Sequence, residues 1–180
     1  MTTETELLKY PIGKRKYSGS LSPLELNTCL NDIESLPAKL RKEVEHLSPE
    51  QLDTPYRPGG WTVRQVVHHF CDSHMNAFIR FKLALTETSP TIKPYAEALW
   101  ADMADCKTMP VEPGLTLITA LHERWTVLLK SLSAVDLQRS YVHPEYGKVF
   151  TLEEAVSLYA WHCNHHLAHI TELKKRNKWQ

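Results

Sequence analysis

The feature that most constrains the fold is a run without glycine or proline near the end of the sequence, residues 151–175. Glycine and proline interrupt helices, so a run that lacks both and repeats apolar residues at helical spacing predicts one long helix. Thr151 is placed to cap its first turn, with Glu154 as the second half of a capping box. The predicted buried stripe of this helix is Leu152, Ala155, Val156, Tyr159, Cys163, Ile170 and Leu173.

Three further segments predict long helices because apolar residues recur in them at helical spacing, namely residues 22–44, 62–87 and 115–132. Pro37 lies inside the first of these, so we expect a kink or a break there. Four long helices predict an all-α fold, a four-helix bundle with additional short helices and long connections. We expect residues 1–180 to form a single domain, because a chain of this length can bury one core.

The connections predict smaller elements. Ser48 opens a short helical turn, and residues 95–105 predict a short helix. Residues 142–150 are compatible with a short extended pair. Residues 7–20 predict an irregular lead-in that packs across the domain, and its basic run at residues 14–16 is expected to be solvated.

Composition limits the classes of function. The chain has 21 basic and 21 acidic residues, so it has no overall basic field that would favour nucleic acid or an anionic membrane surface as a partner. No apolar run approaches the ~18–20 residues that span a bilayer. Residues 1–6 are polar and lack signal-peptide character, so we expect a cytoplasmic protein. The four cysteines form no CxxC pair, which favours buried thiols over disulfides.

The predicted last helix also carries a histidine cluster. Four of the ten histidines of the chain fall within residues 161–170 and form two i, i+4 pairs, His162/His166 and His165/His169. Two imidazoles one helical turn apart can converge on one divalent metal. By helical angle, His166 falls within the apolar stripe and His162 on its edge, whereas His169 lies further out and His165 well off it. The alternative is that these are core histidines satisfied by hydrogen bonds.

A metal site needs at least one further ligand, and the predicted helix 62–87 carries His68 and His69 on opposite flanks of its stripe. The flank of His69 has the small neighbours Ser73 and Ala77, which leave room for a site. This favours His69 only weakly, so either histidine could be the third ligand. Three imidazoles plus an open position are the pattern of a catalytic site. An all-histidine set suits zinc, nickel, copper or iron rather than magnesium or calcium.

Other residues have weaker claims to a role in the site. Cys163 lies inside the histidine cluster, but a packing role is favoured over ligation or a nucleophilic role. Asp72, Asn76 and Glu172 are conceivable acceptors for the second nitrogen of a ligand histidine. No GxGxxG, P-loop, GxSxG or HExxH motif is present.

The segment at residues 55–69, with its Gly60-Trp61 pair, and its continuation through residues 73–76 resemble the DinB-like superfamily, and within it the YfiT group of metal-dependent hydrolases. Residues 10–13, 80–83, 94–95 and 161–170 fit the same group. The resemblance implies a four-helix bundle, usually a homodimer, with one nickel or zinc ion per chain. It places the three ligands at His69, His162 and His166. The wider superfamily often has Arg-Gly-Gln after the last ligand, where this chain has Leu-Ala-His at residues 167–169.

These observations lead to two functional hypotheses. The first is a metal-dependent enzyme in which the metal activates either water, giving a hydrolase, or a low-molecular-weight thiol such as bacillithiol, giving an S-transferase; a small molecule is the expected substrate. The second is a non-catalytic metal- or small-molecule-binding bundle, which a fourth ligand from Cys163 or His169 would favour. Trp161, opposite the core stripe of its helix, would suit the interface of the expected homodimer.

Overall fold

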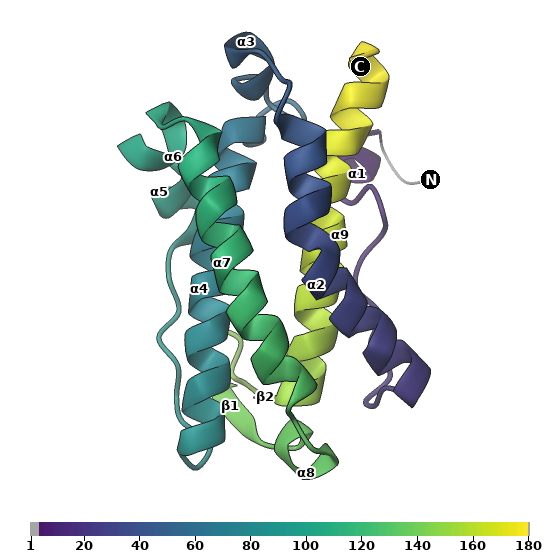
Figure 1. The fold of residues 1–180 in the computed structure, drawn as a ribbon, viewed down its shortest axis with the longest axis vertical. Coiled ribbons are helices and arrows are strands. Elements are labelled where there is room, and N and C mark those ends of the chain that lie inside the picture. Colours follow the sequence, from purple (N-terminus) through teal and green to yellow (C-terminus); the bar gives the residue numbers. More distant parts are fainter. Residues whose placement is uncertain (1–3, 180) are drawn as a thin grey trace.

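The computed structural model describes residues 4–179 and is dominated by four long helices, as predicted. They are α2 (Pro23–Val44), α4 (Val63–Thr86), α7 (Val111–Lys130) and α9 (Leu152–Asn177). Around the bundle, α2 packs on α7 and α9, and α4 packs on the same two helices. Figure 1 shows that α4 and α7 run in one direction and α2 and α9 in the other. The neighbouring helices α4 and α7 are therefore parallel and need a long connection.

The helix starts follow the predicted capping chemistry. Ser22 caps the start of α2 and Thr62 caps the start of α4, and the side-chain oxygen of each accepts a hydrogen bond from the backbone N–H three residues on. Ser48 caps the short helix α3 (Pro49–Leu52) in the same way. At α9, Thr151 Oγ1 accepts from Glu154 N at 3.1 Å, but the Glu154 side chain bonds elsewhere. Only half of the capping box expected there is formed.

Helix α2 continues through Pro37, so the break we considered there is absent. Proline has no N–H and leaves the carbonyl four residues earlier, that of Ile33, without its helical donor. His122 of α7 supplies a replacement, because its Nδ1 lies 2.7 Å from Ile33 O. A contact from the facing helix thus satisfies the backbone group that Pro37 frees.

The connection between α4 and α7 holds two short helices, α5 (Glu97–Ala101) and α6 (Ala104–Thr108), where one was predicted. Helix α7 begins at Val111, about a turn earlier than predicted. Pro113 does not prevent this, because the N–H groups in the first turn of a helix have no helical acceptor.

Between α7 and α9, a short helix α8 (Ala134–Leu137) precedes an antiparallel pair of strands, β1 (Ser140–His143) and β2 (Lys148–Thr151). Ser140 lies opposite Thr151, and His143 lies opposite Lys148. The extended pair predicted in this region is confirmed, with bounds shifted by one or two residues. These strands close one end of the bundle beside α4 and α9 (Figure 1).

The N-terminal segment begins with α1 (Glu4–Lys9) and then runs irregularly along the outer side of α9 (Figure 1). Arg15 Nη2 pairs with the buried Glu154 Oε1 at 2.7 Å. The prediction that the whole basic run at residues 14–16 is solvated is therefore wrong for Arg15. Trp161 Nε1 donates to Gly13 O at 3.2 Å. The segment thus covers the face of α9 that points away from the bundle core, and Trp161 is engaged within its own chain.

The stripe predicted for the last helix is buried in the core, as expected. The largest fully buried side chains of the core include Phe70 and Phe81 of α4, Trp125 of α7, and Ile170 of α9. Within residues 4–179, no helix is both long enough and apolar enough to cross a membrane.

Candidate metal centre

His69 of α4 faces His162 and His166 of α9 across the bundle. One ring nitrogen from each of the three lies within 4.8 Å of the others. His69 Nε2 and His162 Nε2 are 3.2 Å apart. Two nitrogens bound at about 2.0–2.1 Å to one tetrahedral metal lie roughly 3.3 Å apart, so this spacing fits a shared ion. The structure brings together the three residues that the resemblance indicated.

The three imidazoles are neutral. Burial lowers the pKa of His69 to about 3, and burial followed by the neighbouring imidazoles lowers the pKa values of His162 and His166 well below the ordinary range. A neutral imidazole keeps a lone pair on one nitrogen, which is the form that binds metals. His166 Nδ1 is buried with no hydrogen-bond partner among the described residues. The donor set therefore suits a borderline-soft divalent ion.

A series of hydrogen bonds fixes the tautomer of His162. It runs from the carbonyl oxygen of Ile33 in α2 through two histidines, His122 and His74, to His162 in α9. Ile33 O can only accept, so His122 Nδ1 carries the hydrogen in this 2.7 Å contact. Burial lowers the pKa of His122 to about 4, so its ring is neutral and its Nε2 accepts from His74 Nδ1 at 2.7 Å. His74 Nε2 then accepts from His162 Nδ1 at 3.1 Å.

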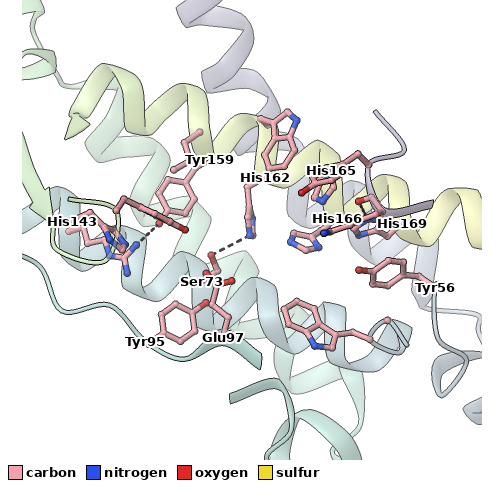
Figure 2. A pocket seen from close by; sticks show the side chains of 18 of the residues that line it. Tyr56, Ser73, Tyr95, Glu97, His143, Tyr159, His162, His165, His166 and His169 are labelled. Carbon is pink, nitrogen blue, oxygen red and sulfur yellow. Dashed lines mark hydrogen bonds between the residues drawn. The ribbon is translucent and has the colours of Figure 1, made fainter. Parts of the chain in front are cut away.

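The consequence is that His162 Nε2 carries a lone pair and no hydrogen. This nitrogen faces His69 Nε2 and lies 3.4 Å from Ser73 Oγ, as the dashed line in Figure 2 shows. No functional role was predicted from the sequence for Ser73, His74 or His122. His74 is fully buried, but the sequence gave no sign that it links His122 to a candidate ligand.

A second group of imidazoles lies on α9. His165, His166 and His169 place one nitrogen each within 4.8 Å of one another, and the Nδ1 atoms of all three are buried without a partner among the described residues. His169 Nε2 donates to Lys9 O at 3.1 Å. Tyr56 stacks on His169 with ring centres 3.9 Å apart. His165 and His169 are off the core stripe, as expected, yet the segments around Lys9 and Tyr56 bury them.

The alternative residues considered from the sequence lie elsewhere. His68 Nε2 is 3.5 Å from Met109 O, on the α6–α7 side of α4. Cys163 is buried, and burial raises the pKa of its thiol well above the ordinary value. It belongs to neither group of converging metal-binding side chains found within residues 4–179. These placements support a packing role for Cys163.

The three residues suggested as acceptors for the second nitrogen of a ligand histidine also form contacts elsewhere. Asp72 lies 3.6 Å from the Cys106 thiol, Asn76 donates to the backbone of Asp72, and Glu172 pairs with Lys175. The partner of His162 Nδ1 is His74 instead, so none of these three residues is the partner of this ligand.

A pocket of about 530 Å³ opens over the histidines between α4 and α9. In Figure 2, Tyr95, His143 and Tyr159 lie on one side of His162, and Tyr56 and His169 lie on the other. The pocket therefore extends in both directions from the candidate ligands. Its lining also includes Arg57, Trp61, Ser73, Arg80, Glu97, Tyr141, Tyr146 and Phe150.

Residues 32–170 match the family model of the DinB superfamily, and the chain belongs to this superfamily. It is 50% identical over 172 residues to YfiT of Bacillus subtilis strain 168, covering 96% of this chain and 97% of that protein. The solved structure of YfiT matches with a TM-score of 0.94 and 49% identity, covering 97% of this chain and 99% of that chain. It is described as a candidate metal-dependent hydrolase with an unusual four-helix bundle topology.

A relative from Oceanobacillus iheyensis is 52% identical over 171 residues, covering 95% of this chain and 98% of that protein, and its name likewise marks it as a candidate metal-dependent hydrolase. The predicted family and bundle are thereby confirmed.

Proposed function

We propose that this protein is a metal-dependent hydrolase whose divalent metal, nickel or zinc, is held by His69, His162 and His166, one ion per chain. The observation that carries this proposal is the convergence of three neutral imidazoles from two helices beside an open pocket, which His162 and His166 line. Bound there, the metal would supply Lewis acidity and lower the pKa of a coordinated water or thiol.

The chain's own residues would prepare and orient this site. The His122–His74 pair holds His162 in the tautomer whose Nε2 lone pair faces the centre. Ser73 Oγ, 3.4 Å from that nitrogen, is placed to orient a molecule bound beside it. Trp61 packs against His69 with ring centres 4.5 Å apart and shields that ligand from water. Such positioning lowers the cost of reaching the reactive geometry.

An open coordination position favours an enzyme over a purely binding bundle. Neither residue suggested as a fourth ligand belongs to the group formed by His69, His162 and His166: His169 converges with His165 and His166 instead, and Cys163 belongs to neither group within residues 4–179. With three protein ligands, one position is left for water or substrate.

The second candidate activity is transfer of a low-molecular-weight thiol to an electrophile. It would use the same metal and histidines, with the thiol sulfur as nucleophile. The extension of the pocket to both sides of His162 favours this alternative, because two molecules must then be held at once. A pocket of about 530 Å³ lies within the usual size range for small-molecule sites.

The test is a comparison of metal-loaded wild type with His166→Ala in two assays. One follows hydrolysis of a panel of activated esters, amides and lactones, and the other follows loss of a thiol in the presence of an electrophile. We expect turnover in one assay that chelator abolishes and His166→Ala lacks. Turnover that survives both treatments would contradict metal-dependent catalysis at this site.

We also propose a homodimer, on the family resemblance alone. Trp161, which suggested an interface from the sequence, bonds to Gly13 and stacks on His165 with ring centres 4.3 Å apart. Light scattering of the purified chain tests the proposal, and a monomeric mass at micromolar concentration would contradict it.

A further inference from the structure

Arg80 of α4 lies in the pocket with few partners. Its side chain is 8% exposed, and Nη1 donates to Tyr159 Oη at 3.3 Å. Its Nε is buried with no hydrogen-bond partner among residues 4–179. Within the same residues, no carboxylate forms an ion pair with Arg80 within 4.0 Å. A guanidinium stays charged at all ordinary pH values, so its burial is costly unless an acceptor compensates it.

Two other buried polar groups near Arg80 also lack partners. Tyr95 Oη precedes α5 and faces Ser73 without forming a hydrogen bond of good geometry, and His143 Nδ1 comes from β1. Both residues line the same pocket as Arg80. In Figure 2, Tyr95 and His143 lie together on the side of His162 that also holds Tyr159. Buried polar groups without partners are rare, and three at one end of a cavity indicate a missing ligand.

We propose that this end of the pocket is a subsite for a carboxylate group of the small molecule on which the protein acts. The planar fork of Arg80 suits the two oxygens of a carboxylate, and the Tyr95 hydroxyl can donate to the same group. A single guanidinium, with the acidic Glu97 nearby, matches a single negative charge better than a phosphate dianion. This proposal rests on the proposed function in one respect: it assumes that the small molecule reacts at the histidines.

The spacing on α4 sets the distance between the two ends. His69, Ser73, Ala77 and Arg80 follow one another at intervals of three or four residues and so share one face of the helix. Ser73 and Arg80 are seven residues apart, which is roughly 10 Å along the helix axis. The ligand should therefore lie along this face of α4, with its carboxylate towards Arg80 and its reacting atom towards the histidines.

Glu97 is the acidic side chain that competes for Arg80. It is an exposed residue at the pocket rim; desolvation raises its pKa, and the charge of Arg80 opposes that shift. It forms no ion pair with Arg80 within the described residues, so the guanidinium stays available to a ligand. Removing the Glu97 charge should strengthen binding of an anion at this subsite.

The test uses the full chain freed of metal with a chelator and then dialysed, with benzoate as the probe. Tyr141, Tyr146 and Phe150 line this end and suit an aromatic carboxylate. Titration is followed by calorimetry and by nuclear magnetic resonance of labelled protein. We expect benzoate to bind at least about tenfold more tightly than benzamide or inorganic phosphate, since a charge-assisted pair is worth that factor or more.

Variants locate the binding. Arg80→Gln should weaken benzoate binding by about tenfold or more, Arg80→Lys should weaken it less, and Glu97→Gln should strengthen it. Arg41→Gln is the matched control, because Arg41 pairs with Glu112 on the exposed surface of α2 and α7. Tyr95→Phe removes one hydroxyl without changing the charge and should weaken binding several-fold.

Equal binding of benzoate and benzamide, or unchanged binding by Arg80→Gln, would overturn the subsite. Preference for phosphate over benzoate would overturn the carboxylate assignment. Because the measurement is made without metal, its outcome does not depend on whether the three histidines bind an ion, and the two proposals can fail separately.

Discussion

His122 Nδ1 lies 2.7 Å from the carbonyl oxygen of Ile33, the group that Pro37 leaves without a helical donor. This contact starts a chain of hydrogen bonds that crosses the bundle and ends at His162. A proline in α2 is thereby linked to the lone pair of a candidate metal ligand in α9. The buried polar groups of this chain satisfy one another, which sets a unique arrangement.

His122→Leu interrupts this series of hydrogen bonds and leaves Ile33 O and His74 Nδ1 without partners. We expect metal affinity to fall about 10- to 100-fold, the usual effect of losing an outer partner of a ligand histidine. His122→Gln is the matched variant, because its amide can donate to Ile33 and accept from His74. Chelator competition measures the metal affinity of both variants. Equal losses of affinity in His122→Leu and His122→Gln would contradict a role for these hydrogen bonds.

Pro37→Ala restores an N–H that can donate to Ile33 O within α2. The carbonyl would then be shared between this new backbone donor and His122, so we expect a weaker contact to His122 and a smaller loss of metal affinity than in His122→Leu. Nitrogen chemical shifts of the His122 ring report the change directly. An unaltered His122 spectrum would show that Pro37 has no part in setting this tautomer.

Stability should depend on pH because His122 is buried as a neutral ring. Its pKa is about 4 in the fold, below the ordinary 6.5 of the unfolded chain, so the unfolded state binds more protons between these values. Stability is full above pH 6.5 and is lost as pH falls towards 4, by about 2 kcal/mol between pH 7 and pH 5 from this residue.

Urea unfolding of metal-free protein at pH 7 and pH 5 measures this loss. His69, His165 and His169 also have pKa values lowered by burial and act in the same direction. His122→Gln should therefore lose about 2 kcal/mol less than wild type over this interval. The same pH dependence in both proteins would contradict a neutral buried His122.

Arg15→Gln should loosen the N-terminal segment from α9. Glu154 is a buried carboxylate held by Arg15 and by Lys148 Nζ at 2.6 Å, so one cation remains and we expect a loss of about 1 kcal/mol in unfolding free energy. Lys14→Gln is the control, because the exposed Lys14–Glu6 pair should contribute little. Equal effects in chemical denaturation would mean that Arg15 does not anchor the segment.

The four long helices were predictable because their apolar stripes recur at helical spacing, and three of them, α2, α4 and α9, begin after a capping Ser or Thr. The packing of the N-terminal segment on α9 was not predictable in this way, because the contacts of Arg15 and Lys9 with this helix join residues more than a hundred positions apart. For that reason, helical angle alone placed His165 and His169 outside the core without showing that they are buried.

The candidate site was partly predictable for a similar reason. Helical phase favoured the pair His162/His166, but the choice of His69 over His68 depends on which flank of α4 faces α9, and the resemblance decided it. The role of His122 depends on a proline in another helix that happens to lie opposite. Metal binding by His69, His162 and His166 stays a prediction.

The most direct measurement is the metal content of untagged protein, compared among single alanine variants. We predict about one nickel or zinc per wild-type chain, lost in His69→Ala, His162→Ala and His166→Ala and kept in His165→Ala and His169→Ala. Retention in His69→Ala with loss in His165→Ala and His169→Ala would place the metal at the second imidazole group. Absence of metal from reconstituted wild type would contradict the proposed metal centre altogether.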